Sequence, residues 1–187
     1  MKFEQWFHFY RARMLALFGM EARAIEAYQT ALRVAPGFAL AANCLGFMFA
    51  SKGDPGRAEQ YFLEALRMDP ANGSTHFNLG FLYSSRKEYD QAIRSFQAAV
   101  SLQPKIDRAW FGLGMAHAAR GEHLEAVPAF EKAAMLQPMN PHALYELGLA
   151  HRALGDQGKV DGIIEQLRSF DPKVAQQLEE ASRTGMN

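Results

Sequence analysis

The sequence has a single cysteine, no net charge and no long hydrophobic run. One cysteine cannot form an internal disulfide, so nothing in the composition points to an oxidising compartment. The 20 Lys and Arg residues balance the 20 Asp and Glu residues. This balance argues against a nucleic-acid-binding protein, because such proteins usually carry a strong basic excess. We therefore expect a folded protein that has no nucleic acid among its partners.

The longest uncharged stretch, from Val34 to Ser51, is interrupted by proline, glycine and asparagine. A membrane-spanning helix needs about 20 predominantly apolar residues, so this stretch predicts a buried helix and no membrane insertion. Near the N-terminus, no small-residue cleavage site follows a hydrophobic segment. We expect a cytoplasmic protein.

Phenylalanine, in contrast, is abundant, with 14 in 187 residues, and several of these residues belong to a repeat with a period of 34. Leu-Gly pairs mark the period at Leu45, Leu79, Leu113 and Leu147. The other positions in phase are Ala58, Ala92, Ala126 and Val160; Phe62, Phe96, Phe130 and Ile164; Ala65, Ala99, Ala133 and Leu167; and Pro36, Pro70, Pro104, Pro138 and Pro172. Because apolar residues within one period recur at helical spacing, each period predicts a pair of helices.

This pattern resembles the tetratricopeptide repeat (TPR) family, whose motif places Leu-Gly and Tyr in a first helix and Ala, Phe, Ala and Pro in and after a second. The resemblance implies an all-α fold, a right-handed TPR solenoid of antiparallel helix pairs. It makes residues 1–187 a single TPR domain with repeats at 5–38, 39–72, 73–106, 107–140 and 141–174 and a capping helix at about 172–183.

The residue types at the repeated positions have a physical reason. Glycine after leucine lets two helices approach closely, and the large phenylalanine fills the space between one repeat and the next. Proline stops one helix and opens another at its first turn, where no backbone donor is needed. Pro128 is expected near the first turn of its own helix for the same reason.

The sequence offers little for catalysis, and we expect no enzyme, no cofactor and no metal site. Cys44 lies in a hydrophobic segment without a neighbouring His or charge, which is typical of a small buried side chain. His117 and His151 occupy equivalent positions one repeat apart, but a third metal ligand is not evident. The sequence has no HExxH motif, no phosphate-binding loop and no GxGxxG motif.

In TPR arrays the first helix of each repeat lines a concave groove, and the resemblance carries that role to matching positions here. The implied partner-binding residues are Phe47, Phe77, Phe81, Phe111, Met115, Tyr145, Leu149, Asn43, Asn78 and Arg108. Two known TPR binding modes are not supported: the carboxylate clamp lacks its cationic partners, and only Asn78 fits an asparagine ladder, since Gly112 stands at the next such position.

The favoured hypothesis is a protein–protein interaction adaptor or scaffold, which binds a partner peptide or helix through an apolar, aromatic-rich concave groove. The partner would present large apolar anchors, with Arg13, Arg108 and Arg152 holding acidic groups at the rim. One alternative is a self-assembling structural unit that forms homo-oligomers through the aromatic residues Trp6, Phe7 and Phe9. A remote alternative is a metal site built on the two repeat-related histidines.

Overall fold

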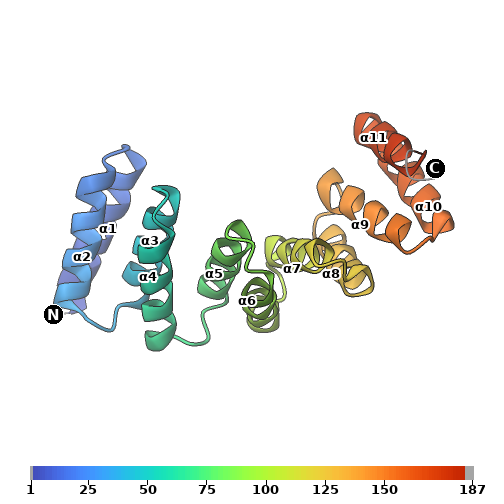
Figure 1. Ribbon diagram of the computed structural model, residues 1–187. Helices are drawn as coiled ribbons and strands as arrows, with labels where there is room; N and C mark the ends of the chain where they lie inside the picture. The colour runs from blue at the N-terminus through green and yellow to red at the C-terminus, as the bar shows by residue number, and fades with distance from the viewer. Residues whose placement is uncertain (1, 184–187) are drawn as a thin grey trace. The chain divides into compact units, whose positions relative to one another are not determined.

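The protein is described by a computed structural model that covers residues 2–183, and its regular structure there is entirely helical (Figure 1). The helices are α1 (Lys2–Leu17), α2 (Glu21–Val34), α3 (Ala39–Ser51), α4 (Pro55–Met68), α5 (Gly73–Ser85), α6 (Tyr89–Leu102), α7 (Asp107–Ala119), α8 (His123–Leu136), α9 (Pro141–Ala153), α10 (Gln157–Arg168) and α11 (Pro172–Arg183). This confirms the all-α prediction. None of the helices between residues 2 and 183 combines the length and the apolar character needed to cross a membrane.

The chain forms two compact units, which meet between Arg86 and Lys87. In the first unit α1 packs on α2, α3 packs on α4, and α5 contacts both α3 and α4. In the second unit α7 packs on α8, and α9 contacts α8, α10 and α11. Short connections join the partners of the pairs α1–α2, α3–α4, α7–α8 and α9–α10, as in antiparallel helical hairpins, so these four predicted helix pairs are confirmed. The repeat boundaries, the single-domain assignment and the right-handed curvature stay predictions.

A glycine of the first helix packs against a phenylalanine of the second in two of the hairpins, α3–α4 and α7–α8. A Cβ atom at Gly46 would lie 2.5 Å from the ring of Phe62, and one at Gly114 would lie 2.6 Å from the ring of Phe130. Both rings are buried, so the two helices can only be this close because the glycine has no side chain. In the last repeat Leu178 of α11, and not Ile164, takes the place against the glycine at position 148.

Short polar side chains begin several helices. Each accepts a hydrogen bond from a backbone N–H group in the first turn, a group that has no partner within the helix. The accepting side chain, the residue whose backbone N–H donates and the N–O distance are Asp54, Arg57 and 3.0 Å; Asn72, Thr75 and 3.0 Å; Asn140, His142 and 3.1 Å; Asp156, Lys159 and 3.2 Å; and Asp171, Val174 and 3.1 Å. The last of these starts α11, which closes the second unit and buries Leu178.

The turn inside each hairpin needs a left-handed residue at a position that also recurs every 34 residues. Gly19, Gly53, Gly121 and Gly155 occupy it with φ between 71° and 77°. Lys87 occupies it once, with φ of 61°. Because a side chain at positive φ is strained, this lysine is a local departure from the repeat.

Pro128 does not lie where the sequence placed it. It is the sixth residue of α8, inside the helix and beyond the first turn. The expectation was wrong because α8 begins as early as His123, and the helix accommodates a proline that donates no backbone hydrogen bond there.

Candidate functional site

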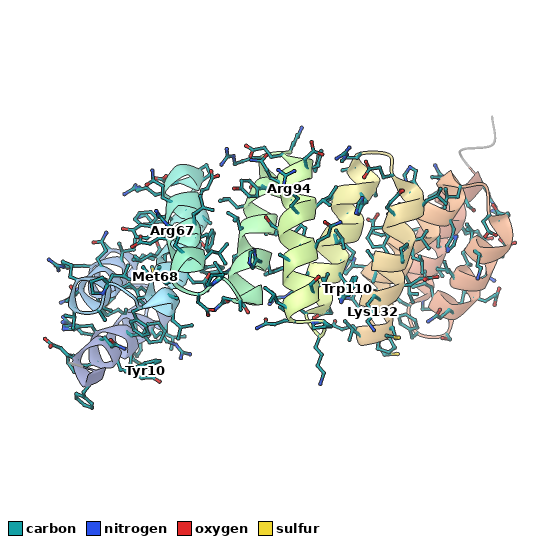
Figure 2. All side chains as sticks on the ribbon, turned by 90° about the horizontal axis from the view of Figure 1, so that it is seen from below. Tyr10, Arg67, Met68, Arg94, Trp110 and Lys132 are labelled. Atoms are coloured by element: carbon teal, nitrogen blue, oxygen red, sulfur yellow. The ribbon has the colours of Figure 1, made fainter. Side chains whose placement is uncertain are left out.

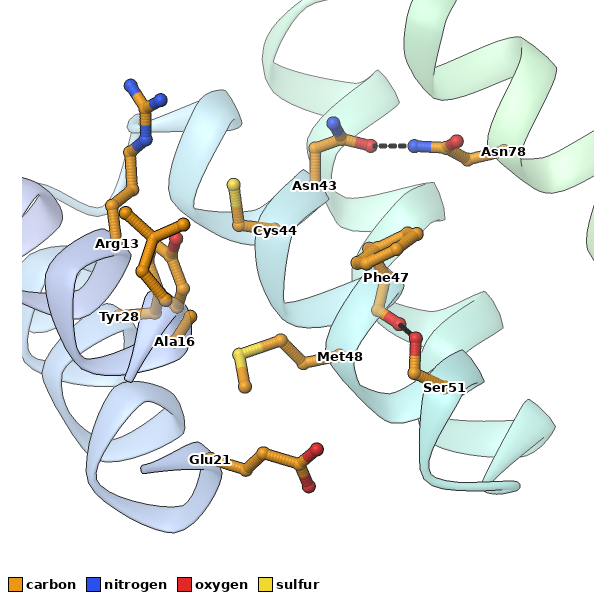
Figure 3. Close-up of a pocket in the computed structure, with 11 residues that line it drawn as sticks. Arg13, Ala16, Glu21, Tyr28, Asn43, Cys44, Phe47, Met48, Ser51 and Asn78 are labelled. Atoms are coloured by element: carbon orange, nitrogen blue, oxygen red, sulfur yellow. Dashed lines mark hydrogen bonds between the residues drawn. The ribbon is translucent and has the colours of Figure 1, made fainter. Parts of the chain in front are cut away.

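Helices α1, α2, α3 and α5 of the first unit enclose a pocket of about 450 Å3 (Figure 3). Its lining residues are Arg13, Ala16 and Leu17 of α1, Glu21 and Tyr28 of α2, Asn43, Cys44, Phe47, Met48 and Ser51 of α3, and Asn78 of α5. The lining combines apolar side chains with six that carry a polar group, two of which, Arg13 and Glu21, are charged. We call this hollow the first-unit pocket.

Two side-chain amides meet at one edge of the first-unit pocket. Asn78 Nδ2 donates a hydrogen bond to Asn43 Oδ1 over 3.0 Å, as Figure 3 shows. An amide group offers two donor hydrogens and an acceptor oxygen with two lone pairs. One mutual bond therefore leaves most of this capacity for a group that enters the pocket, such as the backbone of a peptide.

Aromatic side chains lie beside this amide pair with much of their surface exposed. Phe47 is 60% exposed and Phe81 is 66% exposed, whereas Phe77 is half-buried. Such exposure is unusual for phenylalanine, which is most often buried. Ser51 Oγ donates a hydrogen bond to the carbonyl of Phe47 over 3.1 Å, one turn further along α3. The first unit thus presents two aromatic rings and two amides on its predicted groove positions.

Cys44 departs from its sequence assignment as a packing residue. It is only partly buried and lines the first-unit pocket, because the sixth position of this helix faces the groove side. Burial raises the pKa of the Cys44 thiol, while a hydrogen bond with Tyr28 and the charge of Arg13 oppose that rise. Burial also raises the pKa of the Tyr28 hydroxyl. Both groups stay neutral at physiological pH, so the charges that line this pocket are those of Arg13 and Glu21.

The second unit carries a smaller hollow of about 270 Å3 on its own predicted groove positions. Arg108 and Phe111 of α7 line it together with His142 and Glu146 of α9. Burial raises the pKa of Glu146, and the neighbouring His142 lowers it in part. An arginine and a half-buried carboxyl therefore lie within this hollow.

The remaining predicted groove residues of the second unit differ in exposure. Met115 is 39% exposed, while Tyr145 and Leu149 are partly buried. Phe47 and Phe81 belong to the first unit and these three to the second, so a continuous apolar stripe stays a prediction.

Arg152 does not stand free at the rim as the sequence suggested. Its guanidinium donates a hydrogen bond to the carbonyl of Ala181 in α11. The arginine was misassigned because the capping helix folds back against α9, a contact that lies outside the 34-residue period. It therefore ties the cap to the second unit.

The two histidines of the metal alternative each contact an acid from the same hairpin. His117 Nδ1 lies 2.8 Å from Glu122, and His151 Nδ1 lies 3.9 Å from Asp156. In the described part of the chain, no group of three His, Cys, Asp or Glu side chains is arranged to hold a metal ion. These pairs recur one repeat apart and join the end of a first helix to the start of a second.

Comparison with known sequences and structures adds the family. A tetratricopeptide repeat profile matches residues 22–73, 79–136 and 125–159, and a second such profile matches residues 61–94. A search of curated proteins found no matching relative.

Several solved structures are similar in fold. YrrB, a TPR protein with an unusual peptide-binding site, is 23% identical over 92% of this chain and 90% of its own, with a TM-score of 0.79. A MamA chain from Desulfovibrio magneticus RS-1 is 21% identical over 90% of this chain and 97% of its own, with a TM-score of 0.77. Pseudomonas aeruginosa pilF is 17% identical over 96% of this chain and 98% of its own, with a TM-score of 0.72. At these identities the likeness concerns the fold alone.

Proposed function

The chain belongs to the tetratricopeptide repeat family, and we propose that it is a protein–protein interaction adaptor that binds a peptide or helix of its partner in the first-unit pocket. The observation that carries this proposal is the combination of an open, partly apolar pocket with an amide pair at its edge and two exposed phenylalanines on the same helices. Folding of the hairpins does not require these rings to be exposed. YrrB, with its peptide-binding site, is a precedent on the same fold.

The energetics suit a modest affinity. Fully burying a phenylalanine side chain contributes about 1.5–3 kcal/mol, and Phe47 and Phe81 would each gain only the exposed part of that area. A large apolar anchor of the partner, which fills the pocket beside Met48, contributes a similar amount. Ordering the peptide and losing its translational freedom costs several kcal/mol. These three side chains alone do not reach the roughly −8 kcal/mol of a micromolar complex, so such an affinity also requires main-chain hydrogen bonds and further apolar contacts along the groove positions.

The amide pair of Asn43 and Asn78 can bind the main chain of the partner. Asn43 and Asn78 can together accept from an N–H group and donate to a C=O group, which is what an extended peptide or the end of a helix presents. Each such bond in a partly buried setting contributes about 0.5–1.5 kcal/mol. A partner would therefore be held by side-chain anchors in the apolar part and by its main chain at the amides.

The second unit adds a further surface of mixed character. The hollow that contains Arg108, Phe111 and Glu146 offers one ring and groups of both charge signs. We propose that it is a second binding surface, which contacts polar groups of a partner, and that Met115, Tyr145 and Leu149 belong to this surface of the second unit.

The test is a selection of peptides from a displayed random library on the wild-type chain, followed by measurement of binding by fluorescence polarisation. Phe47→Glu and Phe81→Glu should each weaken a selected peptide at least tenfold while the helical circular dichroism is unchanged. Leu63→Glu is the matched control, because Leu63 is exposed on α4 of the same unit, away from the predicted groove positions of α3 and α5 that carry Phe47 and Phe81. If both phenylalanine variants bind every selected peptide as the wild type does, the proposal fails.

A further inference from the structure

Helix α1 exposes a row of five large apolar side chains that no other described segment covers. The row consists of Phe3, Phe7, Tyr10, Met14 and Leu17, which are between 52% and 83% exposed. We call it the α1 stripe. Figure 2 labels Tyr10, whose ring extends outward from the α1 ribbon. Exposed apolar rows of this length generally mark an interaction surface.

The α1 stripe lies opposite the side of α1 that packs inside the first unit. Phe9 and Ala12 are buried on that inner side, where Phe9 meets the rings of Tyr28 and Phe38. The stripe residues follow one another at intervals of four, three, four and three residues, the spacing by which two helices pack side by side. A helix that is apolar on two opposite sides is usually covered on both.

We propose that the α1 stripe binds the same stripe of a second copy, with the two helices antiparallel about a twofold axis. Glu4 and Arg11 flank the stripe on one and the same side, next to Phe3 and Tyr10. In an antiparallel pair the same flanks of both helices face each other, so Glu4 of each copy lies beside Arg11 of the other. Neither residue has an ion-pair partner among residues 2–183 of its own chain.

The antiparallel arrangement also aligns the large side chains. With Glu4 beside Arg11 of the other copy, Phe7 lies opposite Tyr10 and Phe3 lies opposite Met14, so each aromatic ring meets another large apolar group. A parallel pair would place Arg11 against the other flank of the stripe and leave Glu4 without a cation. Charge therefore selects the antiparallel register.

A head-to-tail contact with the other end of the chain fits poorly. The outer face of α11 carries Lys173, Gln176, Glu180 and Arg183, all exposed. Placing that face on the α1 stripe would take these charged and polar groups out of water and against aromatic rings, which is unfavourable even for charges that are paired within α11. The stripe is thus complementary to itself and not to the terminal helix, and self-complementary surfaces form closed twofold dimers.

The area is sufficient for a reversible dimer. An aromatic side chain buries about 150–250 Å2 when fully covered, so ten side chains that are already partly covered bury roughly 1,000 Å2 together. This lies just below the range of stable standard interfaces, about 1,200–2,000 Å2. We therefore expect a dimer that dissociates in the micromolar range.

The first experiment is sedimentation velocity of the full chain from about 1 to 200 μM. The wild type should change from monomer to dimer, and Phe7→Glu and Met14→Glu should each weaken the dimer at least tenfold. Leu124→Glu, a change at an equally exposed apolar residue of α8, should leave it intact. A wild type that stays monomeric over this range, or a dimer that both α1 variants leave unchanged, overturns the proposal.

The second experiment tests the register. Glu4→Arg and Arg11→Glu should each weaken the dimer, and the double variant should restore it, because the swapped charges pair again. On a Cys44→Ser background, a mixture of Phe7→Cys and Tyr10→Cys chains should form mixed disulfides under mild oxidation. Disulfides between two Phe7→Cys chains alone would refute the antiparallel pair.

A lipid surface is the competing occupant, and vesicles of phosphatidylcholine with phosphatidylserine separate the two. The stripe proposal expects the wild type to stay in solution as a dimer in a flotation gradient. If the chain is monomeric in solution and floats with the vesicles, and if Phe7→Glu abolishes this flotation, then the α1 stripe binds a membrane and the dimer proposal is wrong. Leu17 belongs to both the α1 stripe and the first-unit pocket, but Phe7 and Met14 lie outside that pocket, so their variants should still bind the selected peptides.

Discussion

Gly114→Ala should destabilise the second unit, although alanine is the better helix former. The added Cβ atom would lie 2.6 Å from Cδ1 and Cε1 of Phe130 and 2.9 Å from its Cζ. Carbon atoms in favourable contact stand about 3.5–4.0 Å apart. Phe130 has no exposed surface, so its ring cannot turn into solvent, and either the ring or the backbone of α7 must shift.

The magnitude follows from two opposing contributions. Overpacking a well-filled core typically costs about 1–3 kcal/mol, and replacing glycine by alanine inside a helix gains about 0.8–1.0 kcal/mol. We expect a net loss of about 1 kcal/mol for Gly114→Ala. Gly162→Ala is the matched control, because a Cβ atom at Gly162 in α10 would meet nothing within 4 Å. This variant should gain about 0.5–1 kcal/mol.

Urea unfolding followed by circular dichroism and by tryptophan fluorescence measures both changes, and agreement between the two probes checks that unfolding is two-state. Phe130→Leu in the Gly114→Ala background should recover at least 0.5 kcal/mol relative to additive effects, because the smaller side chain leaves room for the new methyl group. If Gly114→Ala stabilises the chain as much as Gly162→Ala does, the close approach of α7 and α8 is not what requires glycine.

Three further predictions concern a turn, a helix cap and a buried carboxyl. Lys87→Gly should stabilise the chain by about 1 kcal/mol, because it relieves a side chain at positive φ, and Gly121→Ala at the equivalent position should do the reverse; urea midpoints of both variants test this. Asn72→Ala should cost about 0.5–2 kcal/mol, since it removes the cap of α5, again measured by urea unfolding. The raised pKa of Glu146 means that the folded chain holds the carboxyl proton more tightly than the unfolded chain does. This group therefore stabilises the fold fully below the ordinary pKa of glutamate, and that stabilisation is lost as the pH rises through the pKa of the folded chain. Glu146→Gln should therefore be more stable than the wild type at pH 7 and should flatten this part of a stability profile recorded from pH 4 to 8.

The helix pairs were predictable because every hairpin needs the same packing residues, and a 34-residue period repeats them in the sequence. The period did not predict contacts between residues at non-equivalent positions of neighbouring repeats. Gly112 was considered only as a missing ladder residue, yet a Cβ atom there would lie 2.6 Å from the ring of Phe96 in the preceding helix. Leu178 takes the place of a repeat residue because the capping helix continues the stack without the motif. Such contacts depend on neighbouring helices, which one repeat does not describe.

The candidate site was predictable only as a set of positions. The motif indicates which side chains of a first helix face the groove, but not which of them meet. Asn43 is the fifth residue of one predicted repeat and Asn78 the sixth of the next, so a comparison of equivalent positions separates two amides that share a hydrogen bond. The raised pKa of Glu146 was not predictable for a related reason, because the burial of this carboxyl depends on how α7 and α9 lie beside each other.

Helix α1 shows how a family pattern can hide a second periodicity. The sequence hypothesis grouped Phe7 and Phe9 on one exposed end, but residues two apart on a helix differ by roughly 200°. Phe9 accordingly packs inside the first unit while Phe7 points outward, and that part of the expectation was wrong. The four-three spacing from Phe3 to Leu17 is visible in the sequence alone, yet the TPR motif accounts for only one side of this helix. An apolar row that the motif does not explain is therefore the feature for which a second partner, here another copy, has to be considered.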